Sequence, residues 1–289
     1  MGYSLLWRGL FCLLQELRWE IADMAAVLLY CRAGFENDAA NEFMQQASDR
    51  GVFGYVNAKK GRGYVLFECY QEEHARDLIE MFPLQHLIFT RQWFASLLQV
   101  QEMNINDRVG DIVQALKDYG SMPQCGNLRV EHPDTDEGKE LSRFCRKFTV
   151  PLRQALRKNG VLTKKEGDSD NELFVLFTDN QTCYIGFAKT DNCSPLPLGI
   201  LRLKAPSDAP SRSALKLEEA FQVFIPKIKH DERLRSGMNA VDLGACPGGW
   251  TYQLVRRGMF VQAVDNGAIA DSLMESGQVE HFQVDGFSY

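Results

Sequence analysis

The sequence lacks several patterns that would place it in a specialised class of protein. None of its eight cysteines belongs to a C-x-x-C pair, and no histidine spacing suits zinc, so neither a metal site nor a redox motif is supported. No apolar run reaches the length of a membrane-spanning helix, and no internal repeat or low-complexity tract is present. We therefore expect a cytoplasmic protein with reduced thiols, no metal and no membrane association. As a separate expectation, we take the protein to be a monomer.

The chain also lacks an overall positive charge. Its 289 residues carry a formal net charge of −6, so contact with nucleic acid would require a local basic patch. Residues 139–165 provide one, because nine lysines and arginines occur there with a single acid, Glu140. The spacing of Arg143, Arg146 and Lys147 also fits an ordinary solvated helix face. Nine cations against one acid exceed what such a face needs, which favours a nucleic-acid contact.

Residues 1–23 contain two short apolar runs that are interrupted by Arg8 and followed by charged residues. These runs are too short for a membrane helix, and no small-residue cleavage site of a secretory signal follows them. We interpret residues 1–23 as an upstream extension and Met24 as the natural start. A genuine amphipathic helix is the alternative.

The next part of the chain divides into two units and a linker. Residues 24–100 have the order strand, helix, strand, strand, helix, strand, which is ferredoxin-like; the expected strands are 26–30, 52–56, 63–68 and 87–89, and the helices are 37–47 and 71–81. Residues 101–191 contain an expected strand at 127–131, helices at 137–148 and 152–158, and a hairpin of 173–177 with 183–187. Residues 192–210 contain four prolines and are expected to link this part to a domain over 211–289.

The most informative segment is Asp-Leu-Gly-Ala-Cys-Pro-Gly-Gly-Trp at 242–250. It joins an apolar strand over 239–243 to a helix over 250–255. Gly244, Gly248 and Gly249 are expected where the backbone takes a positive φ or comes close to a ligand. Their spacing differs from the G-x-G-x-x-G pattern of dinucleotide sites. A nicotinamide-dependent oxidoreductase is therefore disfavoured.

Two more strands follow this turn, and an acidic residue ends each of them. The strand over 259–264 leads to Asp265, and the strand over 282–284 leads to Asp285. The carboxyl ends of neighbouring parallel strands share one crevice, and a carboxylate there can accept hydrogen bonds from the hydroxyls of a ribose. Taken singly, Asp242 could cap the next helix and the other two could form turns. Together with the glycine turn, the three acids predict a nucleotide-like ligand.

The sequence resembles a known family at three places. Residues 242–250 resemble the S-adenosylmethionine motif of the ribose 2′-O-methyltransferases related to the heat-shock RNA methyltransferase. Residues 144–153 (Phe-Cys-Arg-Lys-Phe-Thr-Val-Pro-Leu-Arg) and 209–220 (Ala-Pro-Ser-Arg-Ser-Ala-Leu-Lys-Leu-Glu-Glu-Ala) resemble the bacterial large-subunit ribosomal RNA methyltransferase M family. The resemblance runs from about residue 24 to residue 289.

This resemblance implies a multidomain α/β fold with a ferredoxin-like unit, a THUMP-type RNA-binding unit over 101–191 and part of a Rossmann-like methyltransferase domain over 211–289. It implies S-adenosylmethionine as the cofactor, and 2′-O-methylation of a cytidine in 23S ribosomal RNA as the reaction. A non-catalytic RNA-binding protein that retains cofactor-like motifs is the alternative function.

The resemblance also implies roles for individual residues. Those expected to bind the cofactor are Asp242, Gly244, Ala245, Cys246, Pro247, Gly248, Gly249, Trp250, Asp265 and Asp285. Those expected to contact RNA are Arg143, Arg146, Lys147, Arg153, Arg157, Lys158 and Arg212. Cys246 is expected to fill a position that needs a small side chain rather than to act in catalysis.

Lys216 matches the first lysine of a Lys-Asp-Lys-Glu set that surrounds the acceptor hydroxyl in the resembled family. Its ammonium could orient that hydroxyl and stabilise developing negative charge on oxygen. Without the resemblance, we would interpret Lys216 as a solvated lysine on an amphipathic helix. The other three members of the set are expected downstream of Tyr289. We therefore expect a truncated chain with an apolar edge strand at 239–243 and little activity of its own.

Overall fold

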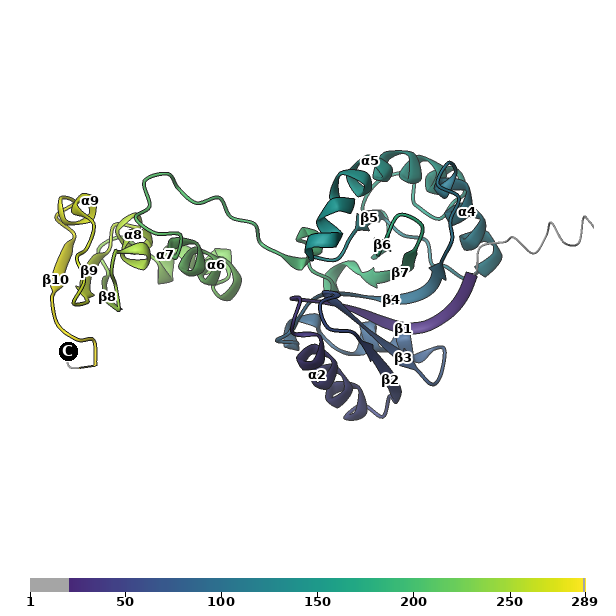
Figure 1. Ribbon diagram of the computed structural model, residues 1–289, viewed down its shortest axis with the longest axis horizontal. Coiled ribbons are helices and arrows are strands. Elements are labelled where there is room, and N and C mark those ends of the chain that lie inside the picture. The colour runs from purple at the N-terminus through teal and green to yellow at the C-terminus, as the bar shows by residue number, and fades with distance from the viewer. Residues whose placement is uncertain (1–20, 288) are drawn as a thin grey trace, which may run out of the picture. The chain divides into compact units, whose positions relative to one another are not determined.

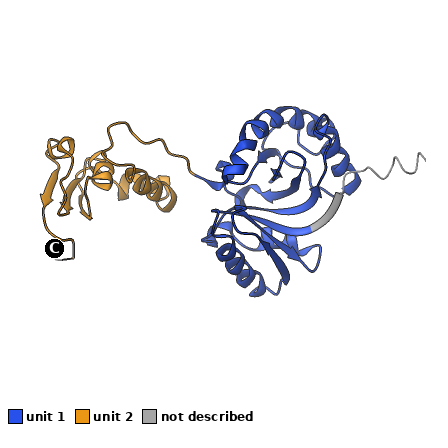
Figure 2. Ribbon diagram, viewed as in Figure 1, with its two compact units in different colours: residues 1–200 blue, residues 201–289 orange. Residues whose placement is uncertain are grey.

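The computed structural model describes residues 21–287 and 289. It divides the chain into two compact units, Met1–Ile200 and Leu201–Tyr289 (Figure 2). Of the predicted extension over 1–23, residues 1–20 lie outside the described residues. Residues 21–23 form the start of the first strand.

Unit 1 is built on one sheet of seven strands in the order β2-β3-β1-β4-β7-β6-β5 (Figure 1). All neighbouring strands are antiparallel except β5 and β6, which are parallel. The predicted ferredoxin-like part supplies β1 to β4, and pairing of β4 with β7 continues the sheet into the predicted RNA-binding part. The strands are β1 (Ile21–Cys31), β2 (Gly54–Ala58), β3 (Tyr64–Cys69), β4 (Thr90–Val100), β5 (Asn127–Glu131), β6 (Asn171–Phe177) and β7 (Cys183–Lys189).

The sheet of unit 1 is strongly curved. The rings of Tyr64 on β3 and Tyr184 on β7 have centroids 6.0 Å apart, although β1 and β4 lie between their strands. Three strand spacings in a flat sheet would separate them by about 14 Å. The concave face is therefore closed by its own side chains, including the stacked rings of Phe94 and Phe174.

Helices cover the opposite face of the sheet (Figure 1). There, Phe43 packs edge-to-face against Phe67 and Trp93 in a fully buried cluster. Local capping explains two helix starts, since Asp107 accepts from the Gly110 N–H and the Thr135 hydroxyl from the Gly138 N–H. The helices of this unit are α2 (Glu36–Ser48), α3 (His74–Met81), α4 (Arg108–Tyr119) and α5 (Asp136–Lys158), with short 3-10 turns at Leu84–His86, Thr190–Asn192 and Pro197–Gly199.

The predicted strand at 87–89 is wrong, and α4 was not predicted. The N–H groups of Ile88 and Phe89 donate to the Glu42 carboxylate at 2.7 and 3.0 Å. This segment is therefore tied to α2, and the strand β4 begins only at Thr90. The cause is a contact between residues 46 positions apart in sequence, which strand propensity does not register.

The two helices predicted at 137–148 and 152–158 are one helix, α5, with Pro151 in its interior. A proline inside a helix costs about 3 kcal/mol because a hydrogen bond is lost. In α5, however, the buried positions continue at spacings of three and four residues on both sides of Pro151. Burial of this stripe offsets the cost of the proline; its members are Leu141, Cys145, Phe148, Leu152 and Leu156.

The first part of the predicted linker is packed on unit 1. The Gln92 side chain holds both the N–H and the carbonyl of Ser194. The Glu131 carboxylate accepts from the Leu198 N–H at 2.9 Å. Burial raises the pKa of the Glu131 carboxyl, and the Leu198 N–H and the Arg129 charge oppose the shift. Residues 194–198 are therefore fixed through buried polar groups.

Unit 2 contains a parallel sheet of three strands in the order β10-β9-β8. Within the described residues β8 is an edge strand, and Val241 and Leu243 on it are 51% and 59% exposed. The predicted third strand at 282–284 is displaced, because β10 already ends at Phe282. The elements are α6 (Ala214–Phe224), a 3-10 turn at Lys227–Lys229, α7 (His230–Arg233), β8 (Asn239–Leu243), α8 (Gly249–Val255), β9 (Phe260–Val264), α9 (Asp271–Met274) and β10 (Val279–Phe282).

Candidate functional site

The glycine-rich turn between β8 and α8 adopts the backbone that its glycines predict. Gly244 and Gly248 have φ angles of +79° and +110°, a region that side chains with a Cβ rarely enter. Gly249 is required for a different reason, because a Cβ there would overlap the Ser213 hydroxyl. The turn thus lets the start of α8 lie directly against the segment that leads into α6.

Asp242 lies beneath this turn and is only 5% exposed. Its Oδ2 accepts hydrogen bonds from the Thr251 N–H at 2.9 Å and from the Thr251 hydroxyl at 2.7 Å. The carboxylate therefore joins the end of β8 to the first turn of α8. Of the two sequence interpretations, helix capping describes the contacts of Asp242 itself. Asp242 would therefore influence ligand binding indirectly, by fixing the conformation of the glycine-rich turn.

Asp265 follows β9 and organises the turn from the other side. Its Oδ1 accepts from the Gly267 N–H at 2.7 Å, and its Oδ2 accepts from the Cys246 N–H at 2.9 Å. These backbone groups, that of Gly267 first, lower the pKa of the Asp265 carboxyl. The group is therefore an anion at neutral pH, and each oxygen keeps a lone pair for a further donor.

A crevice of about 390 Å³ opens at the carboxyl ends of the three strands. Three of the predicted cofactor residues line it: Gly244, Asp265 and Asp285. The prediction that strand-end acids and the glycine turn share one crevice is therefore confirmed for these three. Sequence reasoning missed the other lining residues, Leu243, Val264, Asn266, Val284, Gly286 and Phe287.

The other predicted cofactor residues do not line the crevice. Ala245 is buried in the core of unit 2, whereas Cys246, Pro247 and Trp250 are exposed. The Cys246 thiol donates to the Ala268 carbonyl at 3.2 Å, and a Cβ on Gly267 would overlap that thiol. This contact explains why residue 267 is a glycine, and the expectation that position 246 needs a small side chain stays a prediction.

The crevice fits an adenosyl ligand in size and in chemistry. Its volume lies within the range of about 300–1,000 Å³ that is usual for small-molecule sites. Leu243, Val264 and Val284 give it apolar walls, and Asp265 and Asp285 place carboxylates among them. Apolar walls suit a nucleobase, and carboxylates suit hydroxyl and ammonium donors.

Lys216 lies on α6 and is exposed. Two residues further along, Glu218 forms an ion pair of 2.6 Å with Arg257, just after α8. Arg257 also lies over the ring of Phe221 on α6, with its guanidinium carbon 4.6 Å from the ring centroid. The helix that carries Lys216 is thus fixed to the helix that follows the glycine turn. Arg212 precedes this helix and is also exposed.

The predicted RNA-contacting residues of unit 1 all lie on α5. At 100° per residue they fall within an arc of roughly 140° around the helix. Arg153 and Arg157 are partly neutralised, because each lies 3.5 Å from the Glu166 carboxylate. We call these six residues of α5 the cation row. Its other four members are exposed, and no ion pair joins them to a described carboxylate; they are Arg143, Arg146, Lys147 and Lys158.

Among residues 21–287 and 289, no cluster of histidine, cysteine or carboxylate side chains is arranged to hold a metal ion. No helix in the same part of the chain is long and apolar enough to cross a membrane. The seven cysteines that the structure describes are free thiols.

Three family profiles match successive parts of the chain. They are the RlmM ferredoxin-like domain over residues 24–94, the N-terminal domain of ribosomal RNA large subunit methyltransferase M over 107–189, and the FtsJ-like methyltransferase over 209–288. The last match contains the glycine turn, the crevice and α6.

Full-length relatives agree with these profiles. The chain is 52% identical to the ribosomal RNA large subunit methyltransferase M of Pseudoalteromonas translucida (strain TAC 125), over 92% of this chain and 73% of that protein. It is 54% identical to the protein of the same name from Shewanella loihica (strain ATCC BAA-1088 / PV-4), over 92% of this chain and 72% of that one. The family that the sequence motifs predicted is therefore confirmed: the chain belongs to the ribosomal RNA large subunit methyltransferase M family.

Proposed function

We propose that the chain carries the S-adenosylmethionine site of an enzyme that methylates the ribose 2′ hydroxyl of a cytidine in 23S ribosomal RNA. The observation that carries this proposal is the crevice at the ends of β8, β9 and β10, where Gly244, Asp265 and Asp285 come together. Ligands of open α/β sheets bind in this position.

Asp265 would hold the ribose of the cofactor. Its carboxylate is already oriented by the Cys246 and Gly267 N–H groups, so no side-chain freedom is lost when a hydroxyl binds. Asp285 accepts from the Phe287 N–H at 2.9 Å and would serve the adenine or methionine end. Bound S-adenosylmethionine supplies an activated methyl group.

Lys216 would act on the acceptor ribose. As an ammonium it would donate a hydrogen bond to the 2′ oxygen, orient the hydroxyl and stabilise the negative charge that develops as its proton leaves. The tight packing of Gly249 against Ser213 and the Glu218–Arg257 ion pair relate α6 to the cofactor turn. Fixing donor and acceptor groups in this way supplies much of the rate of a displacement reaction.

The cation row on α5 would hold the RNA. Its exposed members, Arg143, Arg146, Lys147 and Lys158, lie along one face, which suits contact with phosphates rather than with base edges. Within this proposal the part of unit 1 over 101–191 is the RNA-binding unit of THUMP type.

Three measurements test the proposal. Isothermal titration of S-adenosylmethionine into the chain should give saturable binding, and transcribed 23S ribosomal RNA should bind with an affinity that falls steeply with salt. An absence of cofactor binding would contradict the proposed site. RNA binding without any cofactor binding would favour the non-catalytic alternative. A methylation assay on the same RNA, in which a Lys216→Ala variant should lose any turnover that the chain shows, tests the role of Lys216.

A further inference from the structure

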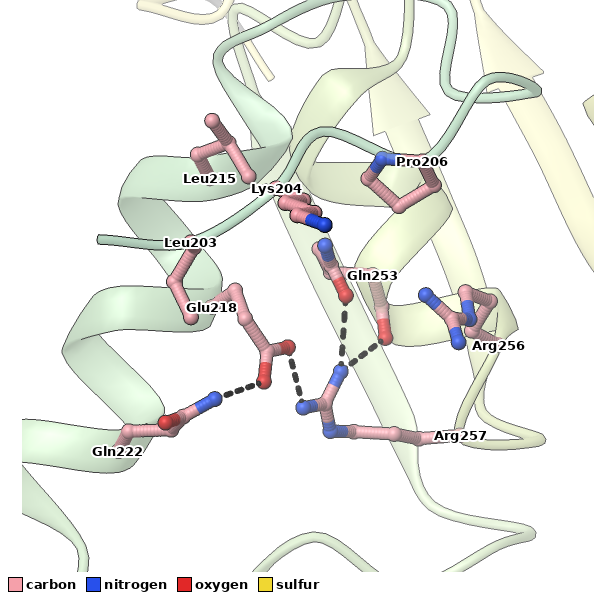
Figure 3. A pocket seen from close by; sticks show the side chains of 9 residues that line it. All are labelled: Leu203, Lys204, Pro206, Leu215, Glu218, Gln222, Gln253, Arg256 and Arg257. Atoms are coloured by element: carbon pink, nitrogen blue, oxygen red, sulfur yellow. Dashed lines mark hydrogen bonds and ion pairs between the residues drawn. The ribbon is translucent and has the colours of Figure 1, made fainter. Parts of the chain in front are cut away.

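A second cavity of about 400 Å³ lies in unit 2, between α6, α8 and the segment 203–206 (Figure 3). It shares no lining residue with the cofactor crevice. Its walls are predominantly polar, with only Leu203, Pro206 and Leu215 as apolar members; the polar members are Lys204, Glu218, Gln222, Gln253, Arg256 and Arg257.

One acid and one base of this pocket neutralise each other. The Glu218 carboxylate accepts from Arg257 at 2.6 Å and from Gln222 at 2.7 Å. Arg257 also donates to the carbonyl and side-chain oxygens of Gln253 at 2.9 and 3.1 Å. Figure 3 shows these bonds as one connected network. Glu218 therefore pairs directly with Arg257, and it also acts at longer range on Arg256, whose charge helps to lower the pKa of the Glu218 carboxyl.

Two cations remain, Lys204 and Arg256. Both are exposed, and neither forms an ion pair with a carboxylate within the described part of the chain. The Arg256 guanidinium lies over the Tyr252 ring, with its carbon 5.7 Å from the centroid, so the aromatic face restricts its position. Three bases against one acid give the pocket a local excess of two positive charges, in a chain whose net charge is −6.

The chemistry of this pocket indicates a phosphate group. Arginine and lysine donors are the usual partners of phosphate oxygens, and the Gln222 amide lines the same cavity. No aromatic side chain lines it, so it lacks a stacking surface for a nucleobase. A phosphate held without base contact is a backbone contact, which positions a nucleic acid without reading its sequence.

We propose that this pocket binds a phosphodiester group of the RNA substrate through Lys204 and Arg256. The inference rests on the proposed function and adds a second RNA contact, in unit 2, to the cation row on α5. Leu215 and Glu218 line the pocket on α6, and Lys216 lies between them in sequence. A phosphate bound here is therefore anchored on the helix that carries Lys216.

The test uses the full chain and a transcribed fragment of 23S ribosomal RNA, with binding measured by fluorescence anisotropy at several salt concentrations. Each of Lys204→Gln and Arg256→Gln should weaken RNA binding about tenfold at low salt, because each removes a charge-assisted hydrogen bond. The double variant should flatten the slope of log affinity against log salt by about 0.7, because both cations contact the same phosphate. Arg235→Gln is the matched control, since Arg235 is an exposed arginine of unit 2 outside the pocket.

S-adenosylmethionine affinity, measured by calorimetry on the same variants, should be unchanged. RNA binding by the double variant that equals the unmodified chain at every salt concentration would overturn the proposal. Inorganic phosphate at constant ionic strength provides a second arm. If phosphate alone saturates the pocket and the variants lose only that binding, the site serves free phosphate and the RNA assignment is overturned. Failure of the proposed function would look different, because the unmodified chain would then bind no cofactor.

Discussion

The carboxylate of Asp242 is predicted to hold the turn between β8 and α8 together, so Asp242→Ala should loosen α8 locally. The change removes the acceptor for both the N–H and the hydroxyl of Thr251. Thr251 is 0% exposed, so water does not replace the lost partner without local opening. A buried donor without a partner costs about 1–3 kcal/mol.

For two such donors, one of which can rotate toward another acceptor, the expected loss is about 2–4 kcal/mol. This loss should appear in hydrogen–deuterium exchange of a peptide that covers residues 249–255. The opening free energy of α8 falls by the same amount, so exchange should accelerate about 30- to 700-fold. Peptides from β6 and β7 in unit 1 should exchange as before.

Thr251→Val is the matched control, because it removes the hydroxyl and keeps the N–H bond to Asp242. It should cost about 1 kcal/mol. An Asp242→Ala variant whose α8 peptide exchanges no faster than that of Thr251→Val would refute the reasoning. The carboxylate would then contribute nothing to the turn beyond the hydroxyl contact.

Three further outcomes are expected. Asp265→Ala should weaken S-adenosylmethionine binding at least about tenfold in calorimetry, and unchanged affinity would contradict its role at the ribose. Burial raises the pKa of Glu131 in the folded protein, so the folded protein loses stability when this carboxyl ionises. Glu131→Gln should therefore raise the melting temperature by an amount that grows as the pH rises above the unfolded pKa of about 4.3. Equal gains at pH 4 and pH 8 would show that ionisation is not involved. A triple variant with Arg143→Gln, Arg146→Gln and Lys147→Gln should flatten the slope of log RNA affinity against log salt concentration by about 2. An unchanged slope would show that α5 is not part of the RNA-binding surface.

Local pattern was sufficient where an element depends on its own residues. The strand over 127–131 was predicted with its observed bounds, because its apolar residues and its flanking turns are contiguous. The local pattern was insufficient where contacts with residues far away in the sequence determine the structure. The carboxylate of Glu42 binds the backbone near residue 88, and no window of neighbouring residues contains both partners. The error at α5 has another cause: the apolar spacing of three and four does continue across Pro151 in the sequence, but proline is usually a helix breaker.

The site divides in the same way. The rule that strand-end residues of a parallel sheet meet at one edge placed Gly244, Asp265 and Asp285 together. It did not single out Asn266 or Phe287, whose positions depend on hydrogen bonds within the loops after β9 and β10. The Asn266 carbonyl is held by Gln283 at 3.1 Å, and the Phe287 N–H by Asp285 at 2.9 Å. The assignment of Lys216 to the acceptor hydroxyl came from family resemblance and stays a prediction.

The continuity of α5 has a consequence for the RNA contact that we propose for this helix. Two separate helices would let the basic groups before and after Pro151 move independently and follow a tightly folded loop. A single helix instead sets Arg143 and Lys158 about 22 Å apart along one axis. A nucleic acid that meets both ends at once must present phosphates along a path of that length. A duplex flank or an extended strand satisfies this requirement.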